Sequence, residues 1–200
     1  MLDLESIILP LSAFAFVTTI TPGPVNLMIT ASGANYGFIR TLPFVLGTCI
    51  GFFCLQLSIA SGLGILFHHY PSLQLLLKIA GSVYLLHLAW KIASAAISNY
   101  PDKKEKPITF IQASLFQFLN PKAWLMAITA MATFPVADQH YLMNASLIAA
   151  IFSLINLPSA AAWACFGISM RRFLRNSKSL RYFNLTMATL VVCTIIFMFY

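Results

Sequence analysis

Long apolar stretches follow one another along this chain, and short polar connectors separate them. Six such stretches cover roughly 6–36, 41–67, 71–97, 108–134, 141–170 and 180–200. A helix of about 20 mostly apolar residues can cross a bilayer, so the pattern predicts six transmembrane helices. No connector is long or polar enough to form a separate soluble domain. We therefore expect an all-α membrane protein in which residues 1–200 form a single transmembrane domain.

The composition agrees with a bilayer as the solvent of this chain. Of its 200 residues, 60% are hydrophobic and 8% are charged, whereas about 25% are charged in an ordinary globular domain. Asp3 and Glu5 stand where a secretory signal peptide would carry basic residues, so no signal peptide is expected. The net charge of +7 comes largely from short connectors between apolar stretches. That distribution favours the cytoplasmic leaflet, and we expect no nucleic-acid partner.

Basic residues occur in alternate connectors, which predicts the orientation of the helices. Ten of the twelve lie in or beside the first, third and fifth connectors: Arg40; Lys91, Lys103, Lys104 and Lys106; Arg171, Arg172, Arg175, Lys178 and Arg181. Because Lys and Arg favour the cytoplasmic side, these connectors are expected there. With six spans, both termini then face the periplasm of a bacterial inner membrane. The oligomeric state stays open, a homo-oligomer included.

The chain also divides into two halves of similar layout. The polar linker "NYPDKKEKP", residues 99–107, separates a first repeat, 1–98, from a second, 108–200. Each half has three spans, and an odd number makes the second copy inverted in the membrane. Pro22 and Pro121 are 99 residues apart, and this offset carries the second and third spans onto the fifth and sixth. We expect two inverted three-helix repeats.

Proline interrupts the first and fourth spans near their centres. The first contains Pro22, Gly23 and Pro24, and the fourth contains Pro121 in "QFLNPKAW". Proline removes a backbone donor and clashes with the preceding turn, so helices one and four are expected to break at mid-membrane. Freed carbonyls must then face protein or a water-filled cavity. Paired interruptions in inverted halves indicate a substrate site, although a single proline such as Pro158 can equally mark a simple kink.

These motifs resemble those of the lysine exporter (LysE/RhtB) superfamily of amino-acid efflux carriers. The resemblance covers nearly the whole chain and rests on "TPGPVNLMITASGANYG", "GTCIG", "KIAGSVYLLHLAWKI" and the Asn-Pro-Lys of span four. It implies an amino-acid exporter driven by the proton-motive force. "KPITFIQASLFQFLN" and "MATF" look most like the cysteine/O-acetylserine branch. Homoserine, threonine and leucine exporters share the motifs, so small neutral amino acids or their derivatives stay open as substrates.

Lys122 is the most informative candidate residue. A cation at the bilayer centre usually faces a cavity or a partner, and no span contains an acidic residue to pair with it. The substrate carboxylate is therefore its predicted partner, while basic amino acids are disfavoured as substrates. Lys122 is also the predicted proton-coupling residue, since a lysine away from water can lose its proton. Alternatively, it binds the carbonyls of a broken helix.

The other predicted substrate-binding residues flank the two breaks or lie in span five: Thr21, Pro22, Gly23, Pro24, Asn26, Asn120, Pro121 and Asn156. Thr21 is equally expected to act instead as the N-cap of the half-helix that follows. Pro158 and Trp163 are expected beside Asn156 in the cavity wall. Glycines four residues apart, Gly33/Gly37 and Gly47/Gly51, predict close helix packing.

Three classes of function fit a polytopic membrane protein. The leading hypothesis is a secondary transporter, in which the two halves open the site alternately to each side. A membrane enzyme is disfavoured because no span contains paired carboxylates or a nucleophile–base pair. His68 and His69 lack further metal ligands, so neither a metal site nor a cofactor is expected. A passive channel or a membrane scaffold is the alternative.

Overall fold

The computed structural model describes residues 4–63, 69–94, 107–134, 141–174 and 177–196. These residues form helices and no strand, which confirms the all-α prediction. Residues 99–106 of the predicted linker lie outside the described part of the chain. The elements in order are α1 (Leu4–Ile20), α2 (Pro24–Tyr36), α3 (Phe38–Ser58), the π-helical turn η1 (Ile59–Leu63), α5 (Pro71–Ala93), α6 (Phe110–Leu119), α7 (Pro121–Thr133), α8 (Tyr141–Phe173) and α9 (Ser177–Ile196).

Four described helical segments are long and apolar enough to cross a membrane: Phe38–Leu63, Leu75–Ala93, Tyr141–Arg171 and Lys178–Ile196. A fifth candidate is the bent pair of α1 and α2, whose axes differ by 61°. The described residues thus give four or five spans by length and composition, where the sequence pattern predicted six. The difference lies in stretch 108–134, which is divided into α6, of 10 residues, and α7, of 13.

Both predicted helix breaks are present. Helix α1 ends at Ile20 and α2 begins at Pro24, while α6 ends at Leu119 and α7 begins at Pro121. Both new helices start with proline in the first turn, where the missing N–H has no intrahelical partner to lose. Proline does not break every helix, however. Helix α8 continues through Pro158, so this residue does not divide a third span.

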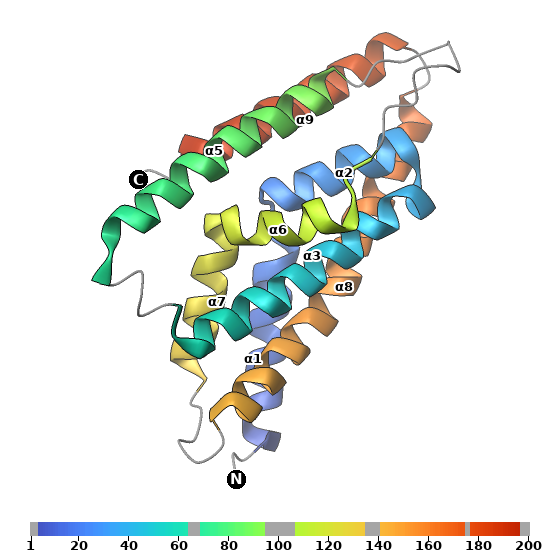
Figure 1. Cartoon of the computed structure of the whole chain (residues 1–200). Helices are drawn as coiled ribbons and strands as arrows, with labels where there is room; N and C mark the ends of the chain where they lie inside the picture. The colour runs from blue at the N-terminus through green and yellow to red at the C-terminus, as the bar shows by residue number, and fades with distance from the viewer. Residues whose placement is uncertain (1–3, 64–68, 95–106, 135–140, 175–176, 197–200) are drawn as a thin grey trace.

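The two halves of the chain are interlocked (Figure 1). Helices α3 and α8 pack against each other. Helix α8 also packs on α1 and α2, the broken helix of the first half, and α3 packs on α6 and α7, the broken helix of the second half. Helices α5 and α9 lie side by side along one flank. Each central helix therefore supports the break that belongs to the other half.

Small residues permit the closest of these contacts. A Cβ atom at Gly33 would overlap the carbonyl oxygen of Ala164, and one at Gly47 or Gly51 would overlap the backbone of α6. The packing prediction is confirmed for these three glycines, but it is wrong for Gly37. Within the described part of the chain, no atom lies within 4 Å of a Cβ added at Gly37. Gly37 instead joins α2 to α3 with a φ of 79°, a conformation that favours glycine.

The buried apolar residues form two clusters, and the breaks lie between them. One cluster joins α2 and α6 to the neighbouring parts of α3, α5, α8 and α9. The other joins α1 and α7 to the later part of α3 and the first part of α8. Phe14, Phe52 and Phe152 belong to this second cluster, with ring centroids 5.9 Å apart for Phe14–Phe152 and 5.2 Å for Phe52–Phe152. The polar backbone of the breaks is thus held between two apolar cores.

Candidate functional site

The backbone carbonyls freed by the first break have hydrogen-bond partners. Asn26, in the first turn of α2, donates its Nδ2 hydrogens to the carbonyls of Thr19 at 2.7 Å and Thr21 at 2.9 Å. Trp163 Nε1 of α8 donates to the carbonyl of Ile20 at 3.1 Å. An unsatisfied carbonyl in an apolar surrounding is costly, so these side chains stabilise the break. Asn26 and Trp163 therefore have a structural role whether or not they contact a substrate.

Lys122 joins the two breaks directly. Its Nζ donates to the carbonyl oxygen and the hydroxyl of Thr21, both at 2.8 Å, and lies 3.4 Å from the carbonyl oxygen of Pro22. The alternative prediction, that Lys122 binds the carbonyls of a broken helix, is therefore confirmed. Two interruptions that are about a hundred residues apart in the sequence are neighbours in space.

The second break has a cap built from Asn120. Its backbone is extended, with φ −95° and ψ 107°, as expected for a residue before proline. The side-chain oxygen accepts from the backbone N–H of Lys122 at 3.2 Å. The carbonyl of Asn120 accepts from the amides of Ala123 and Trp124 at 3.0 and 3.2 Å. The first turn of α7 is thus satisfied locally, and Asn120 acts as its N-cap.

The first turn of α2 differs, because its N-cap is Gly23 and has no capping side chain. Within the described residues, the amides of Val25 and Asn26 have no hydrogen-bond acceptor. These amides and the helix dipole favour an anion at this end. The alternative that Thr21 caps α2 is wrong. Its hydroxyl donates backward to the carbonyl of Thr18 at 2.8 Å and accepts from Lys122.

A cavity lies between the breaks. Six of the nine predicted site residues line it, namely Gly23, Pro24, Asn26, Asn120, Lys122 and Asn156, whereas Thr21, Pro22 and Pro121 do not. The prediction that Pro158 and Trp163 share this wall is wrong, since neither lines the cavity. Among the lining residues that the structure describes, Lys122 is the one that carries a charge.

The sequence prediction missed eight residues of the cavity wall: Thr18, Thr19, Val25, Thr48, Phe52, Gln117, Ala123 and Met126. Gln117 carried a recognisable signal, because it is a carboxamide in an apolar stretch, three residues before the Asn-Pro-Lys motif. The hydroxyl of Thr48 donates to the carbonyl of Val45 at 2.7 Å. Threonine commonly bonds to its own helix in this way, so Thr48 gave no distinct signal.

The residues that the structure describes contain no candidate metal site. Across the ranges that the structure describes, no group of three or more His, Cys, Asp and Glu side chains is placed to hold an ion. The cavity instead combines one ammonium, free backbone amides, neutral polar side chains and apolar walls. These groups can bind a small solute with an anionic end.

Together, the apolar helices, the two broken helices and the polar cavity define the chain as a multi-pass membrane protein of the transporter class. A family model, described as LysE type translocator, matches residues 16–200. The chain belongs to this family, which confirms the resemblance drawn from its motifs. The family consists of transporters, and the prediction that the chain is not an enzyme is likewise confirmed.

Similar curated proteins carry a more specific name. The cysteine/O-acetylserine efflux proteins of Escherichia coli (strain K12), Shigella sonnei (strain Ss046) and Shigella flexneri are each 30% identical to this chain over 197 residues. The matches cover 95% of this chain and 97% of each relative. No solved structure matches the chain.

Proposed function

We propose that this chain exports a small neutral amino acid or derivative across the bacterial inner membrane, by proton-coupled alternating access. Cysteine, O-acetylserine, homoserine, threonine and leucine are the candidate substrates. The observation that carries the proposal is the contact of Lys122, from the second break, with Thr21 of the first break beside the cavity. The names of the similar efflux proteins support the same substrate class.

The substrate carboxylate binds between Lys122 and the free amides of α2 in this proposal. A lysine ammonium has three donors, and in the structure they face the two oxygens of Thr21 and, at a longer 3.4 Å, the carbonyl of Pro22. A carboxylate can replace the weakest of these contacts at little cost. The cavity wall contains no carboxylate among its described residues, which disfavours lysine or arginine as cargo.

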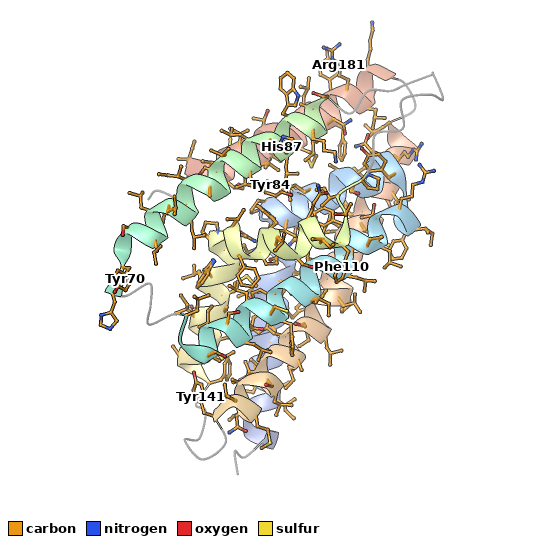
Figure 2. All side chains as sticks on the ribbon, viewed as in Figure 1. Tyr70, Tyr84, His87, Phe110, Tyr141 and Arg181 are labelled. Atoms are coloured by element: carbon orange, nitrogen blue, oxygen red, sulfur yellow. The ribbon has the colours of Figure 1, made fainter. Side chains whose placement is uncertain are left out.

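Six spans follow if each broken helix counts as one crossing: α1 with α2, and α6 with α7. The interlocked packing of the halves supports two inverted three-helix repeats (Figure 1). Basic residues occur near the start of α3, the end of α5, the end of α8 and the start of α9. These helix ends lie toward one end of the molecule, where Figure 2 shows Arg181, while Tyr70 and Tyr141 lie toward the other. We assign the basic end to the cytoplasm, which places both termini in the periplasm.

The two apolar cores support alternating access in this proposal. The cavity lies between them, so loosening of one core opens it toward one side while the other core stays packed. Lys122 is the proton-coupling residue in this scheme, because its ammonium bonds to the break and its neutral amine does so more weakly. Proton loss therefore weakens the contact between the two halves.

Transport of labelled O-acetylserine from proteoliposomes tests the proposal. We expect saturable efflux that accelerates when the periplasmic side is made more acidic. Lys122→Met should abolish this efflux, whereas Lys122→Arg, which keeps donors and charge, should retain part of it. Circular dichroism and the unfolding midpoint in detergent show whether each variant folds.

Two results would contradict the proposal. Undiminished, proton-driven efflux by folded Lys122→Met would remove Lys122 from the mechanism. A flux that rises linearly with concentration and ignores pH would instead support a passive channel.

A further inference from the structure

Gln117 is the unusual polar residue of the cavity wall. It lies near the end of α6, three residues before the second break, and its side chain is 4% exposed. Its Nε2 is buried and has no hydrogen-bond partner within the described part of the chain. A buried donor without a partner is destabilising. Because Gln117 also lines the cavity, a molecule bound there can supply this partner.

The other polar side chains of this wall already make hydrogen bonds. Asn26 donates to the first break, Asn120 accepts from Lys122, and Asn156 donates to Cys49 Sγ at 3.7 Å. The threonine hydroxyls and Lys122 also have partners, including helix carbonyls. Of the polar side chains described along the cavity, Gln117 alone makes no hydrogen bond. Exchange of its amide oxygen and nitrogen by rotation would still leave an atom buried without a partner.

Gln117 lies on a different helix from the groups of the proposed carboxylate site. It is part of α6, whereas that site is formed by Lys122 of α7 and the start of α2. An amino acid held by its carboxylate at that site directs its side chain away from it. A carboxamide is both donor and acceptor, so it suits a hydroxyl, a thiol or an ester carbonyl.

We propose that Gln117 binds the polar end of the substrate side chain and selects amino acids with an uncharged polar side chain over hydrocarbon isosteres. This assignment rests on the proposed export function and narrows its substrate class. It favours O-acetylserine, homoserine, threonine and cysteine, and it disfavours leucine. The physical reason is that a hydrocarbon side chain leaves the buried amide without a partner, and sites with such polar groups reject analogues that cannot pair with them.

Competition in proteoliposomes tests the assignment. Unlabelled homoserine and norvaline, which differ by a hydroxyl in place of a methyl, compete against efflux of labelled O-acetylserine. Wild-type protein should need about tenfold less homoserine than norvaline for half-inhibition, the effect expected of one buried hydrogen bond. Gln117→Met, which keeps the length of the side chain, should bring this ratio close to one.

Gln56 offers a matched control. It is also fully buried, and neither amide atom has a partner in the described residues, but it lies on α3 outside the cavity wall. Gln56→Met should keep the wild-type ratio of homoserine to norvaline. Both variants remove an unsatisfied buried amide, so the unfolding midpoint in detergent should not fall for either.

The outcomes separate this assignment from the proposed function. An unchanged ratio in Gln117→Met, or an equal loss of affinity for both competitors, overturns the assignment, because Gln117 would then contact no part of the substrate side chain. Failure of the wild-type protein to transport O-acetylserine or to be inhibited by either competitor would refute the export function itself.

Discussion

Replacement of Gly23 by alanine should displace Lys122 without breaking the fold. Gly23 precedes α2 with φ −166° and ψ 171°, an extended backbone that any residue adopts. A Cβ atom there would lie 2.9 Å from Cδ and 3.2 Å from Nζ of Lys122. Ordinary contact begins at 3.4 Å, so Cδ must retreat by about 0.5 Å. The neighbour that moves is the end of a flexible side chain rather than backbone.

The size of the effect follows from the hydrogen bonds of Lys122. Its two contacts with Thr21 are at 2.8 Å, and such bonds from a charged group contribute about 1.5–3 kcal/mol each. The added methyl group also narrows the space between the ammonium and the start of α2, where the carboxylate is proposed to bind. Loss of one such contact in the bound state, about 1.5 kcal/mol, weakens substrate binding about tenfold.

The assay is the concentration of O-acetylserine that half-saturates efflux from proteoliposomes, measured beside the unfolding midpoint in detergent. For Gly23→Ala we expect a tenfold higher half-saturating concentration and a decrease of only a few degrees in the midpoint. A double-mutant cycle with Lys122→Arg, the variant expected to retain part of the efflux, gives the cause. If displacement of Lys122 is responsible, the two effects will not add. Wild-type half-saturation in a folded Gly23→Ala protein would refute the placement of the carboxylate.

Two further predictions concern stability. Alanine at Gly33 would overlap the backbone of α8, and alanine at Gly167 would overlap the backbone of α2. Because this backbone cannot move aside, each substitution should prevent folding or lower the unfolding midpoint sharply. A midpoint unchanged from wild type would contradict this close packing. Asn35 and Asn184 donate to each other's side-chain oxygens at 2.8 and 3.1 Å, so alanine at either position should destabilise the protein. Their double-mutant cycle should give a coupling of about 0.6–1.7 kcal/mol, the range typical of membrane proteins, and strictly additive effects would show that the pair is not coupled.

Much of the architecture could be predicted because it depends on local properties of the chain. Apolar stretches are readable in one dimension, and so are the helix breaks, since proline acts on its own turn. The positions of both breaks were predicted in this way. The length of stretch 108–134 predicted a full membrane span. The break at Asn120 and Pro121 instead divides this stretch into two short helices.

The candidate site was only partly predictable. Of the polar residues beside the prolines, Asn26, Asn120 and Lys122 were correctly expected at the cavity, whereas Thr21 does not line it. Gln117 was missed, and Pro158 and Trp163 were wrongly expected in the wall. Trp163 illustrates the reason. Its indole points to the carbonyl of Ile20, and the direction of a side chain on α8 depends on how α8 is rotated against α1, which no local pattern encodes.

The sequence alone determined that this protein resides in a membrane, that two of its helices are interrupted, and that it belongs to a translocator family. These properties follow from hydropathy, from proline and from motifs, each of which acts within a few residues. Only the tertiary structure decided that Lys122 bonds to Thr21 across the two halves, and that Nε2 of Gln117 is buried in the cavity wall with no partner among the described residues. Contacts between distant residues depend on how the helices pack, and packing is a property of the whole fold.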